Sequence, residues 1–239
     1  MKGEPMISIV DVSGHNASPD WAAIAAAGFT VAIVKSSEGV NSPDSKMAMH
    51  CAGARAAGLL IGTYHYLRVR HNAPQDARTQ AQQALDLWRS QKCDLIPIVD
   101  VEGQGNAGCT PSEWAQAVLG WVDECRLQTG RQPCIYTSPG EWSGAGLTGL
   151  SAVADCPLWI AQYASSAHPP PPWTSYVMWQ YTGSGTIAGA GPYDLSRSDD
   201  ITPVLVGGSS SVKAKSATVI LAALSMLGAA GYYIYNRLS

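Results

Sequence analysis

The 239-residue sequence predicts an α/β protein whose main domain is a closed or nearly closed parallel barrel. Apolar, strand-like runs alternate with helical stretches, as they do in βα units. Most runs begin roughly 25 to 40 residues apart, as in a barrel whose connections are helices, and the spacing becomes less regular after Tyr136. The predicted strands are Ile7–Val10, Thr30–Lys35, Leu59–His65, Leu95–Asp100, Pro133–Thr137, Leu158–Tyr163 and Tyr176–Tyr181.

Pairs of a hydroxyl residue and a proline mark the predicted helix starts, because the hydroxyl can cap the helix and proline fits its first turn. These pairs are Ser18-Pro19, Ser42-Pro43 and Thr110-Pro111. Thr110 and Glu113 also have the spacing of a capping box. The segment Ser165–Trp173 contains four consecutive prolines, which excludes a helix and predicts an extended surface loop.

The last part of the chain differs in composition from the barrel. A catalytic domain is expected over residues 1–205, followed by a Gly/Ser/Lys linker over 206–215. Residues 216–236 predict a single C-terminal transmembrane helix, because Ala217–Tyr235 has no charge in 19 positions and would be about 28 Å long. The alternative is a buried helix, for which a complete barrel leaves no core. Residues before Ile7 do not form a cleavable export signal.

The composition excludes several classes of partner. A net charge of −3, without a basic cluster, argues against nucleic acid. The chain has 8 Trp and 10 Tyr but a single Phe, a balance that suits sugar binding as well as core packing. Neither a metal nor another cofactor is expected, because no C-x-x-C pair or Cys/His spacing is present. The cysteines fit either disulfides or buried thiols: Cys51, Cys93, Cys109, Cys125, Cys134 and Cys156.

Asp100 and Glu102 are the first candidates for catalysis. They follow an apolar run, two positions apart, so both carboxylates point to one face at the end of a strand. In a parallel barrel these strand ends form the floor of the active site. Two acids so close raise one pKa and give the protonated and ionised pair that glycosidic cleavage uses. A helix cap or a surface ion pair is the alternative.

Other acids stand at equivalent places in the predicted barrel. Asp11 ends the first strand, Glu38 follows the second, and Asp194 lies near the expected last strand. We expect these acids to converge with Asp100 and Glu102 on one mouth. His65, between Tyr64 and Tyr66, and Arg68 are further candidates for the cleft wall, although a histidine at such a position is commonly a hydrogen-bonded core residue.

An ordered series of fragments resembles glycoside hydrolase family 25, the Chalaropsis-type lysozymes. The resemblance covers about residues 6 to 202 and implies an irregular TIM-like (β/α) barrel of about five βα units plus additional closing strands. The fragments are Asp11-Val-Ser13 with Asp20-Trp21, Val34-Lys-Ser-Ser-Glu-Gly39, Gly62-Thr-Tyr-His-Tyr-Leu-Arg68, Pro97-Ile-Val-Asp-Val-Glu102, Tyr136-Thr-Ser138, Leu158-Trp-Ile-Ala-Gln-Tyr163 and Trp179-Gln-Tyr-Thr-Gly-Ser-Gly185.

The resemblance implies a muramidase that cleaves the β-1,4 bond between N-acetylmuramic acid and N-acetylglucosamine in peptidoglycan. Glu102 matches the family's proton donor, and Asp100 matches the acid that assists the substrate's own N-acetyl group. Asp11 and Asp194 match the remaining acids of the cleft, although Tyr193 stands where the family usually has a small apolar residue. The residues expected to bind substrate are Glu38, Tyr64, Tyr66, Arg68, Tyr136, Trp159, Tyr163 and Gln180.

Competing functions are less well supported. Gly103-Gln-Gly-Asn-Ala-Gly108 reads as a dinucleotide motif, but it follows the fourth strand, and Glu102 beside it would repel a pyrophosphate. No G-x-S-x-G elbow indicates a serine hydrolase. A non-catalytic, membrane-tethered wall-binding module is the main alternative. With the predicted tail, the chain resembles a bacteriophage endolysin anchored in the host inner membrane or a virion membrane, its catalytic domain facing peptidoglycan. A bacterial remodelling enzyme is the alternative origin.

Overall fold

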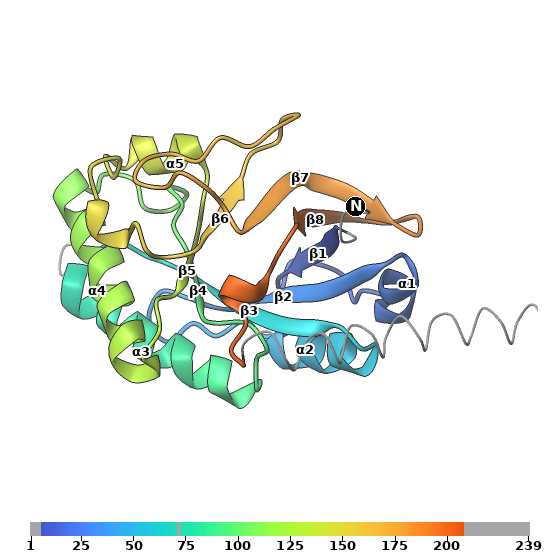
Figure 1. Cartoon of the computed structure of the whole chain (residues 1–239). Coiled ribbons are helices and arrows are strands. Elements are labelled where there is room, and N and C mark those ends of the chain that lie inside the picture. Colours follow the sequence, from blue (N-terminus) through green and yellow to red (C-terminus); the bar gives the residue numbers. More distant parts are fainter. Residues whose placement is uncertain (1–5, 71–72, 208–239) are drawn as a thin grey trace, which may run out of the picture. The chain divides into compact units, whose positions relative to one another are not determined.

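The computed structural model describes residues 6–70 and 73–207, which contain an eight-stranded closed barrel (Figure 1). Neighbouring strands follow one another in chain order from β1 to β8, and β8 closes against β1. This confirms the barrel predicted from the sequence. The strands are β1 Ile7–Val12, β2 Phe29–Glu38, β3 Leu60–Tyr66, β4 Ile98–Asp100, β5 Cys134–Thr137, β6 Leu158–Ala161, β7 Met178–Ile187 and β8 Ala190–Ser198.

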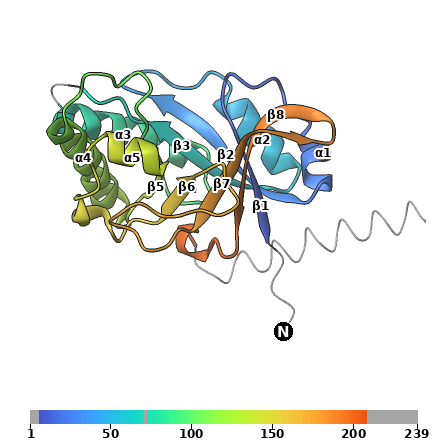
Figure 2. The ribbon, with the colours of Figure 1, turned by 90° about the horizontal axis from the view of Figure 1, so that it is seen from above.

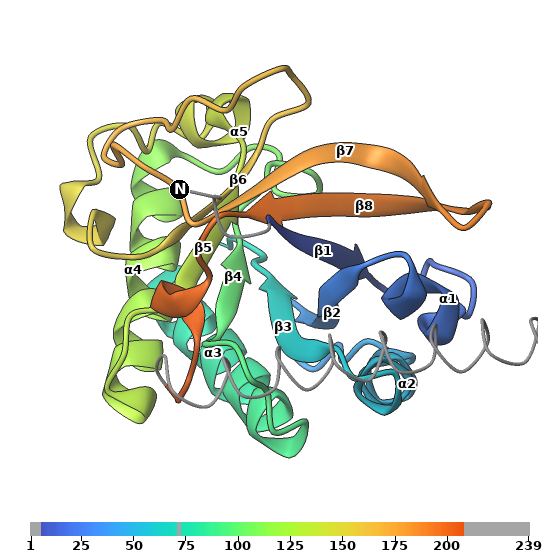
Figure 3. The same cartoon turned by 45° about the vertical axis from the view of Figure 1, so that its right-hand side comes forward.

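The barrel is parallel except at its closure. Each strand from β1 to β6 pairs in parallel with the next one. Strand β8 runs antiparallel to both β7 and β1, so that a long hairpin joins the two ends of the parallel sheet (Figure 3). The short β4 and β5 contrast with the ten-residue β2 and β7, which makes the barrel irregular.

Helices cover the outside of the barrel in two groups: Figure 2 shows α3, α4 and α5 toward the left of the view and α1 and α2 toward the right. Helix α1 contacts β2, and α2 contacts β2 and β3, whereas α3, which also contacts β2 and β3, packs against α4. The helices are α1 Trp21–Ala26, α2 Met47–Ala56, α3 Ala73–Ser90, α4 Pro111–Thr129 and α5 Pro139–Gly144, with 3-10 turns at Ser151–Val153 and Thr202–Val204.

Outward side chains of the strands pack against the helices in two hydrophobic cores. The first core joins α3 and α4 to outward side chains of β4 to β7, among them Val99, Ile135 and Ile160. The second core joins α1 and α2 to outward side chains of β1, β2, β3 and β8, among them Val10 and Leu195. The alternating residues of the same strands therefore face the interior of the barrel.

Two of the three predicted helix starts are wrong. Helix α1 begins after Asp20, whose carboxylate accepts from the backbone of Ala23 at 3.0 Å, so this acid caps the helix in place of Ser18. Ser42-Pro43 lies in a loop where Pro43 forms a β-bridge with Ser37, and α2 begins at Met47. The third start is confirmed, because Thr110 and Glu113 form a capping box.

Three further expectations concern segments and side chains outside the strands. The proline-rich segment 165–173 has no helix, as predicted. All six cysteines lie within the described ranges and are free, five of them buried, which settles the alternatives in favour of thiols. Within residues 6–70 and 73–207, no helix is both long enough and apolar enough to cross a bilayer. The predicted linker from residue 208 on and the predicted span at 216–236 lie outside the described residues.

Candidate active site

A cavity of about 400 Å³ opens at the end of the barrel where the parallel strands finish. Every strand from β1 to β8 contributes at least one lining side chain, from the strand itself or from the loop that follows it. The lining residues are Asp11, Ser13, His15, Lys35, Glu38, Tyr64, Tyr66, Arg68, Asp100, Glu102, Gln104, Tyr136, Trp159, Gln180 and Asp194.

The cavity begins where the inward side chains change from apolar to polar. In β1, Ile9 is fully buried, and the next inward residue is Asp11. In β4, Ile98 is likewise buried, and Asp100 follows it into the cavity. Glu102 continues the same face past the strand end, as the spacing of the sequence predicted. The buried apolar side chains therefore form the bottom of the cavity, and the acids lie above them.

Asp11 and Asp194 form one pair of acids. They are directly opposite each other on β1 and β8, and their side chains share a hydrogen bond. Burial and the neighbouring charge of Asp194 raise the pKa of Asp11 well above its ordinary value. Burial also raises the pKa of Asp194, and its bond to Asp11 opposes that rise. The pair therefore retains a proton to higher pH than either carboxyl would in water.

Asp100 and Glu102 form the second pair. Burial and the charge of Glu102 raise the pKa of Asp100, whose Oδ1 has no hydrogen-bond partner among the described residues. The pKa of Glu102 is raised by burial and by the charges of Glu141 and Asp194, while a hydrogen bond with Tyr136 opposes the rise. Both groups thus retain protons to higher pH than free carboxylates, as a general acid requires.

Gln180 connects the first pair of acids to two tyrosines. Its Nε2 donates to Asp11 Oδ2 at 3.1 Å, and its Oε1 accepts from the hydroxyls of Tyr136 and Tyr163, both at 2.9 Å. Tyr136 in turn packs edge-on against Trp159, with ring centroids 4.6 Å apart. Because one amide makes all three bonds, the aromatic wall and Asp11 are held in a single arrangement.

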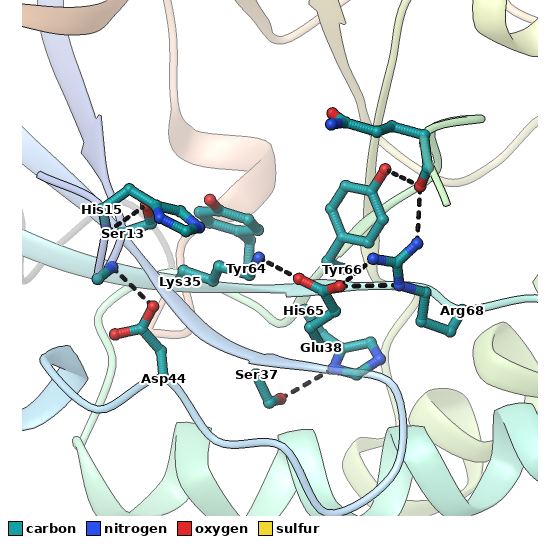
Figure 4. A network of polar contacts seen from close by, with 12 residues as sticks. Ser13, His15, Lys35, Ser37, Glu38, Asp44, Tyr64, His65, Tyr66 and Arg68 are labelled. Atoms are coloured by element: carbon teal, nitrogen blue, oxygen red, sulfur yellow. Dashed lines mark hydrogen bonds and ion pairs between the residues drawn. The ribbon is translucent and has the colours of Figure 1, made fainter. Parts of the chain in front are cut away.

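Charged side chains form the opposite wall, shown in Figure 4. Glu38 accepts from Lys35 at 2.6 Å through Oε2 and from Arg68 through Oε1. The Tyr66 hydroxyl and Arg68 Nη1 both donate to the carbonyl of Gln104 at 2.8 Å. Lys35 and Arg68 also stack on the ring of Tyr66, 5.1 and 5.0 Å from its centroid.

The glycines of the 103–108 loop serve this wall. Gly105 has a φ of +73°, a conformation that favours glycine, and a Cβ added there would lie 1.6 Å from Arg68 Nη1. Gly103 donates its N–H to Glu141 Oε2 at 2.7 Å. The dinucleotide pattern is therefore explained by the close approach of Arg68 and the turn of the loop.

Most predicted site residues meet in this cavity. Tyr163 is the exception: it is 63% exposed and is not among the lining residues, although its hydroxyl donates to Gln180. His65 is a core residue, bonded to Ser37 Oγ at 2.8 Å and Gln80 Oε1 at 2.9 Å, and burial lowers its pKa to about 4.

Among the described residues, no group of His, Cys, Asp and Glu has the arrangement of a metal site. The sequence reasoning missed Ser13, His15, Lys35 and Gln104 as lining residues.

The raised pKa of Asp11 predicts a pH-dependent stability. A carboxyl whose pKa is higher in the folded than in the unfolded chain stabilises the fold at low pH, and this contribution is lost as the pH rises through the folded pKa. The wild type should therefore lose stability as the pH rises above the range in which an ordinary carboxyl group ionises. Asp11→Asn, which cannot ionise, should lose less, as measured by urea unfolding at each pH. The exposed Asp199→Asn is the matched control, and equal slopes for the wild type and Asp11→Asn would contradict the assignment.

Comparison with known proteins identifies relatives along most of the chain. The family model Glycosyl hydrolases family 25 matches residues 10–190. The autolytic lysozyme of Clostridium acetobutylicum is 32% identical over 200 residues, which cover 83% of this chain and 57% of that protein. Lysozyme M1 of Streptomyces globisporus is 23% identical over 185 residues, which cover 75% of this chain and 63% of that one. The chain thus spans less than two thirds of the length of these two relatives.

The fold has relatives among solved structures as well. A muramidase from Acremonium alcalophilum matches with a TM-score of 0.69 and 27% identity, over 80% of this chain and 92% of that one. A family 25 lysozyme from Aspergillus fumigatus matches with a TM-score of 0.71 and 24% identity, over 89% and 98% of the two chains. Since the family model covers far more than half of the sequence, this chain belongs to glycosyl hydrolase family 25.

Proposed function

We propose that this chain is a muramidase, which hydrolyses the β-1,4 bond between N-acetylmuramic acid and N-acetylglucosamine in peptidoglycan. The observation that carries the proposal is the placement of Asp100 and Glu102 together in one cavity, both with raised pKa values. Membership of family 25 supports it, as do relatives named lysozyme and N,O-diacetylmuramidase.

Glu102 is the proposed general acid. Its carboxyl lines the cavity, and its raised pKa keeps the proton to higher pH than a free carboxyl would. That proton goes to the glycosidic oxygen as the bond between this oxygen and the anomeric carbon breaks. The Glu102 carboxylate then accepts a proton from the water that completes hydrolysis, which restores the acid for the next cycle.

Asp100 is the proposed partner of the substrate's acetamido group. In this substrate-assisted route, the acetamido oxygen attacks the anomeric carbon and the nitrogen gains positive charge. The Asp100 carboxylate accepts a hydrogen bond from that nitrogen and stabilises the charge. Its Oδ1, which has no partner among the described residues, is available for this bond.

The walls of the cavity suit a glycan strand. Tyr64, Tyr66, Tyr136 and Trp159 present aromatic faces on which sugar rings can stack, while Gln180 and the acids offer hydrogen-bond partners. We propose that Asp11 and Asp194 bind hydroxyl groups of the sugar at the cleavage site. The exposed Tyr163 would contact the strand at the rim.

Release of new reducing ends tests the proposed activity. The full chain is incubated with purified peptidoglycan, and reducing ends and fragment masses are measured over time. Fragments that end in reducing N-acetylmuramic acid are expected. Fragments that end in reducing N-acetylglucosamine would contradict the assigned bond, and wall binding without any new ends would favour a non-catalytic binding module.

We also propose that the catalytic domain is tethered to a membrane through residues 216–236, in the manner of a bacteriophage enzyme for host lysis or entry. Nineteen consecutive positions without a charge support this proposal. Fractionation of cells that express the full chain should recover it with membranes, and protease added from the periplasmic side should digest the barrel. Recovery of the full chain in the soluble fraction would contradict the tether.

A further inference from the structure

Lys35 lines the mouth of the cavity, and none of the catalytic or substrate-binding roles described above involves it. It is the inward residue of β2 that follows the buried Ile33, and its side chain is 12% exposed. The ammonium group donates to Glu38 Oε2 at 2.6 Å and lies 5.1 Å from the ring centroid of Tyr66. An ammonium group has three donors, so this bond leaves two of them for the cavity.

The rest of the charged wall fixes Lys35 in place. Glu38 is held from its other side by Arg68, whose Nε donates to Oε1 at 2.8 Å. Arg68 and Tyr66 are in turn anchored on the carbonyl of Gln104. Both oxygens of Glu38 are therefore occupied by cations of the protein. This differs from the expectation that Glu38 binds substrate, and it makes Glu38 an anchor for Lys35.

Among the described residues, the Lys and Arg side chains that line the cavity are those of Lys35 and Arg68. Arg68 forms a two-nitrogen ion pair with the same Glu38 carboxylate that Lys35 contacts. Lys35 acts electrostatically on both Asp100 and Glu102, and in each case it opposes the rise of the pKa. The ionisable groups that face Asp100 come from β1, β2, β3, β5 and its own loop: Asp11, Lys35, Glu38, Tyr64, Tyr66, Tyr136 and Glu102.

We propose that Lys35 is a positioning residue for the catalytic carboxyls: Glu38 and Arg68 hold its ammonium group at the mouth, where it is the counter-charge that lets Asp100 ionise while Glu102 keeps its proton. This inference rests on the muramidase activity proposed above. It adds an electrostatic role for the wall of β2 and reassigns Glu38 and Arg68 from sugar contacts to the support of that role.

The pH dependence of kcat/KM tests the proposal. Loss of the ammonium group in Lys35→Met removes a charge that favours both carboxylates, so both limbs of the bell-shaped profile should move to higher pH. A shift of about 1 pH unit is expected, the lower end of what a nearby opposite charge produces. Lys35→Arg keeps the charge and should restore the wild-type midpoints. A merely structural role would lower the rate and leave the midpoints unchanged.

Two further variants complete the experiment. Lys92→Met makes the same substitution at an exposed lysine between α3 and β4, at the opposite end of the barrel, and its midpoints should equal those of the wild type. Lys35→Gln keeps a hydrogen-bond donor for Glu38. Its pH profile replaces that of Lys35→Met if the methionine variant does not fold. If the wild type is active and the pH midpoints of Lys35→Met and Lys35→Gln equal those of the wild type, the proposed role of Lys35 is overturned. An inactive wild type would instead overturn the proposed function.

Discussion

Glu102→Gln is expected to reduce kcat for peptidoglycan hydrolysis by about 10²–10⁴-fold, the range that general acid catalysis contributes. The amide has nearly the shape of the carboxyl group but cannot give a proton to the leaving oxygen. Wall binding and the thermal unfolding temperature should stay close to those of the wild type, because Glu102 stands at the cavity rather than in either hydrophobic core. Reducing-end release at saturating substrate measures the loss.

The matched control is Glu113→Gln. Glu113 belongs to the capping box of α4, and glutamine can fill the same place in that motif. This variant should hydrolyse peptidoglycan within about twofold of the wild type. Near-normal hydrolysis by Glu102→Gln would refute the assignment of the acid, whereas a large loss in both variants would point to damage of the loop after β4.

Asp100→Asn is expected to reduce kcat by about 10²–10³-fold, as removal of a preorganised electrostatic contact does. Unlike the acid, Asp100 acts on the acetamido group, so its effect should not depend on the leaving group. The comparison uses a 4-nitrophenyl glycoside of a short N-acetylated oligosaccharide, whose leaving group needs little protonation. On this substrate the loss in Glu102→Gln should become much smaller, and the loss in Asp100→Asn should persist.

Stability measurements complete the test of Asp100. Its carboxyl is 5% exposed, and burial raises its pKa, so the ionised form is disfavoured by the fold. A neutral asparagine avoids this penalty, and the free energy of unfolding at neutral pH should be equal or higher than in the wild type. The separate roles of the two acids would be contradicted by either of two results. One is that Asp100→Asn is less stable than the wild type, and the other is that both variants regain the same rate on the activated substrate.

The sequence was sufficient to predict the barrel and the main acids, because both follow from the alternation of inward and outward side chains along the strands. Strands that end at one mouth bring Asp11 and Asp100 together whatever their connections are. The same rule applied to β2 would have found Lys35, since it follows Ile33 by two positions. Gln104 could not be found in this way, because it contributes through its backbone carbonyl, which any residue carries.

The bounds of the elements depended on contacts that no local pattern contains. The apolar run Leu95–Asp100 predicts one strand, but β4 starts only at Ile98. Pro97 has no N–H to give, and the N–H of Ile96 bonds to the carbonyl of Val204 from the far end of the domain. Similarly, Asp20 caps α1 although a Ser-Pro pair stands just before it.

The division of the outer packing into two cores has a consequence for the catalytic centre. Asp11 and Asp194 stand on strands that pack with α1 and α2, whereas Asp100 and Glu102 stand on and after a strand that packs with α3 and α4. Each pair of acids therefore stands on strands that a different core supports from outside. The separation of the two pairs depends on how both cores pack, so sequence changes in either core can alter the active site without changing a residue that lines the cavity.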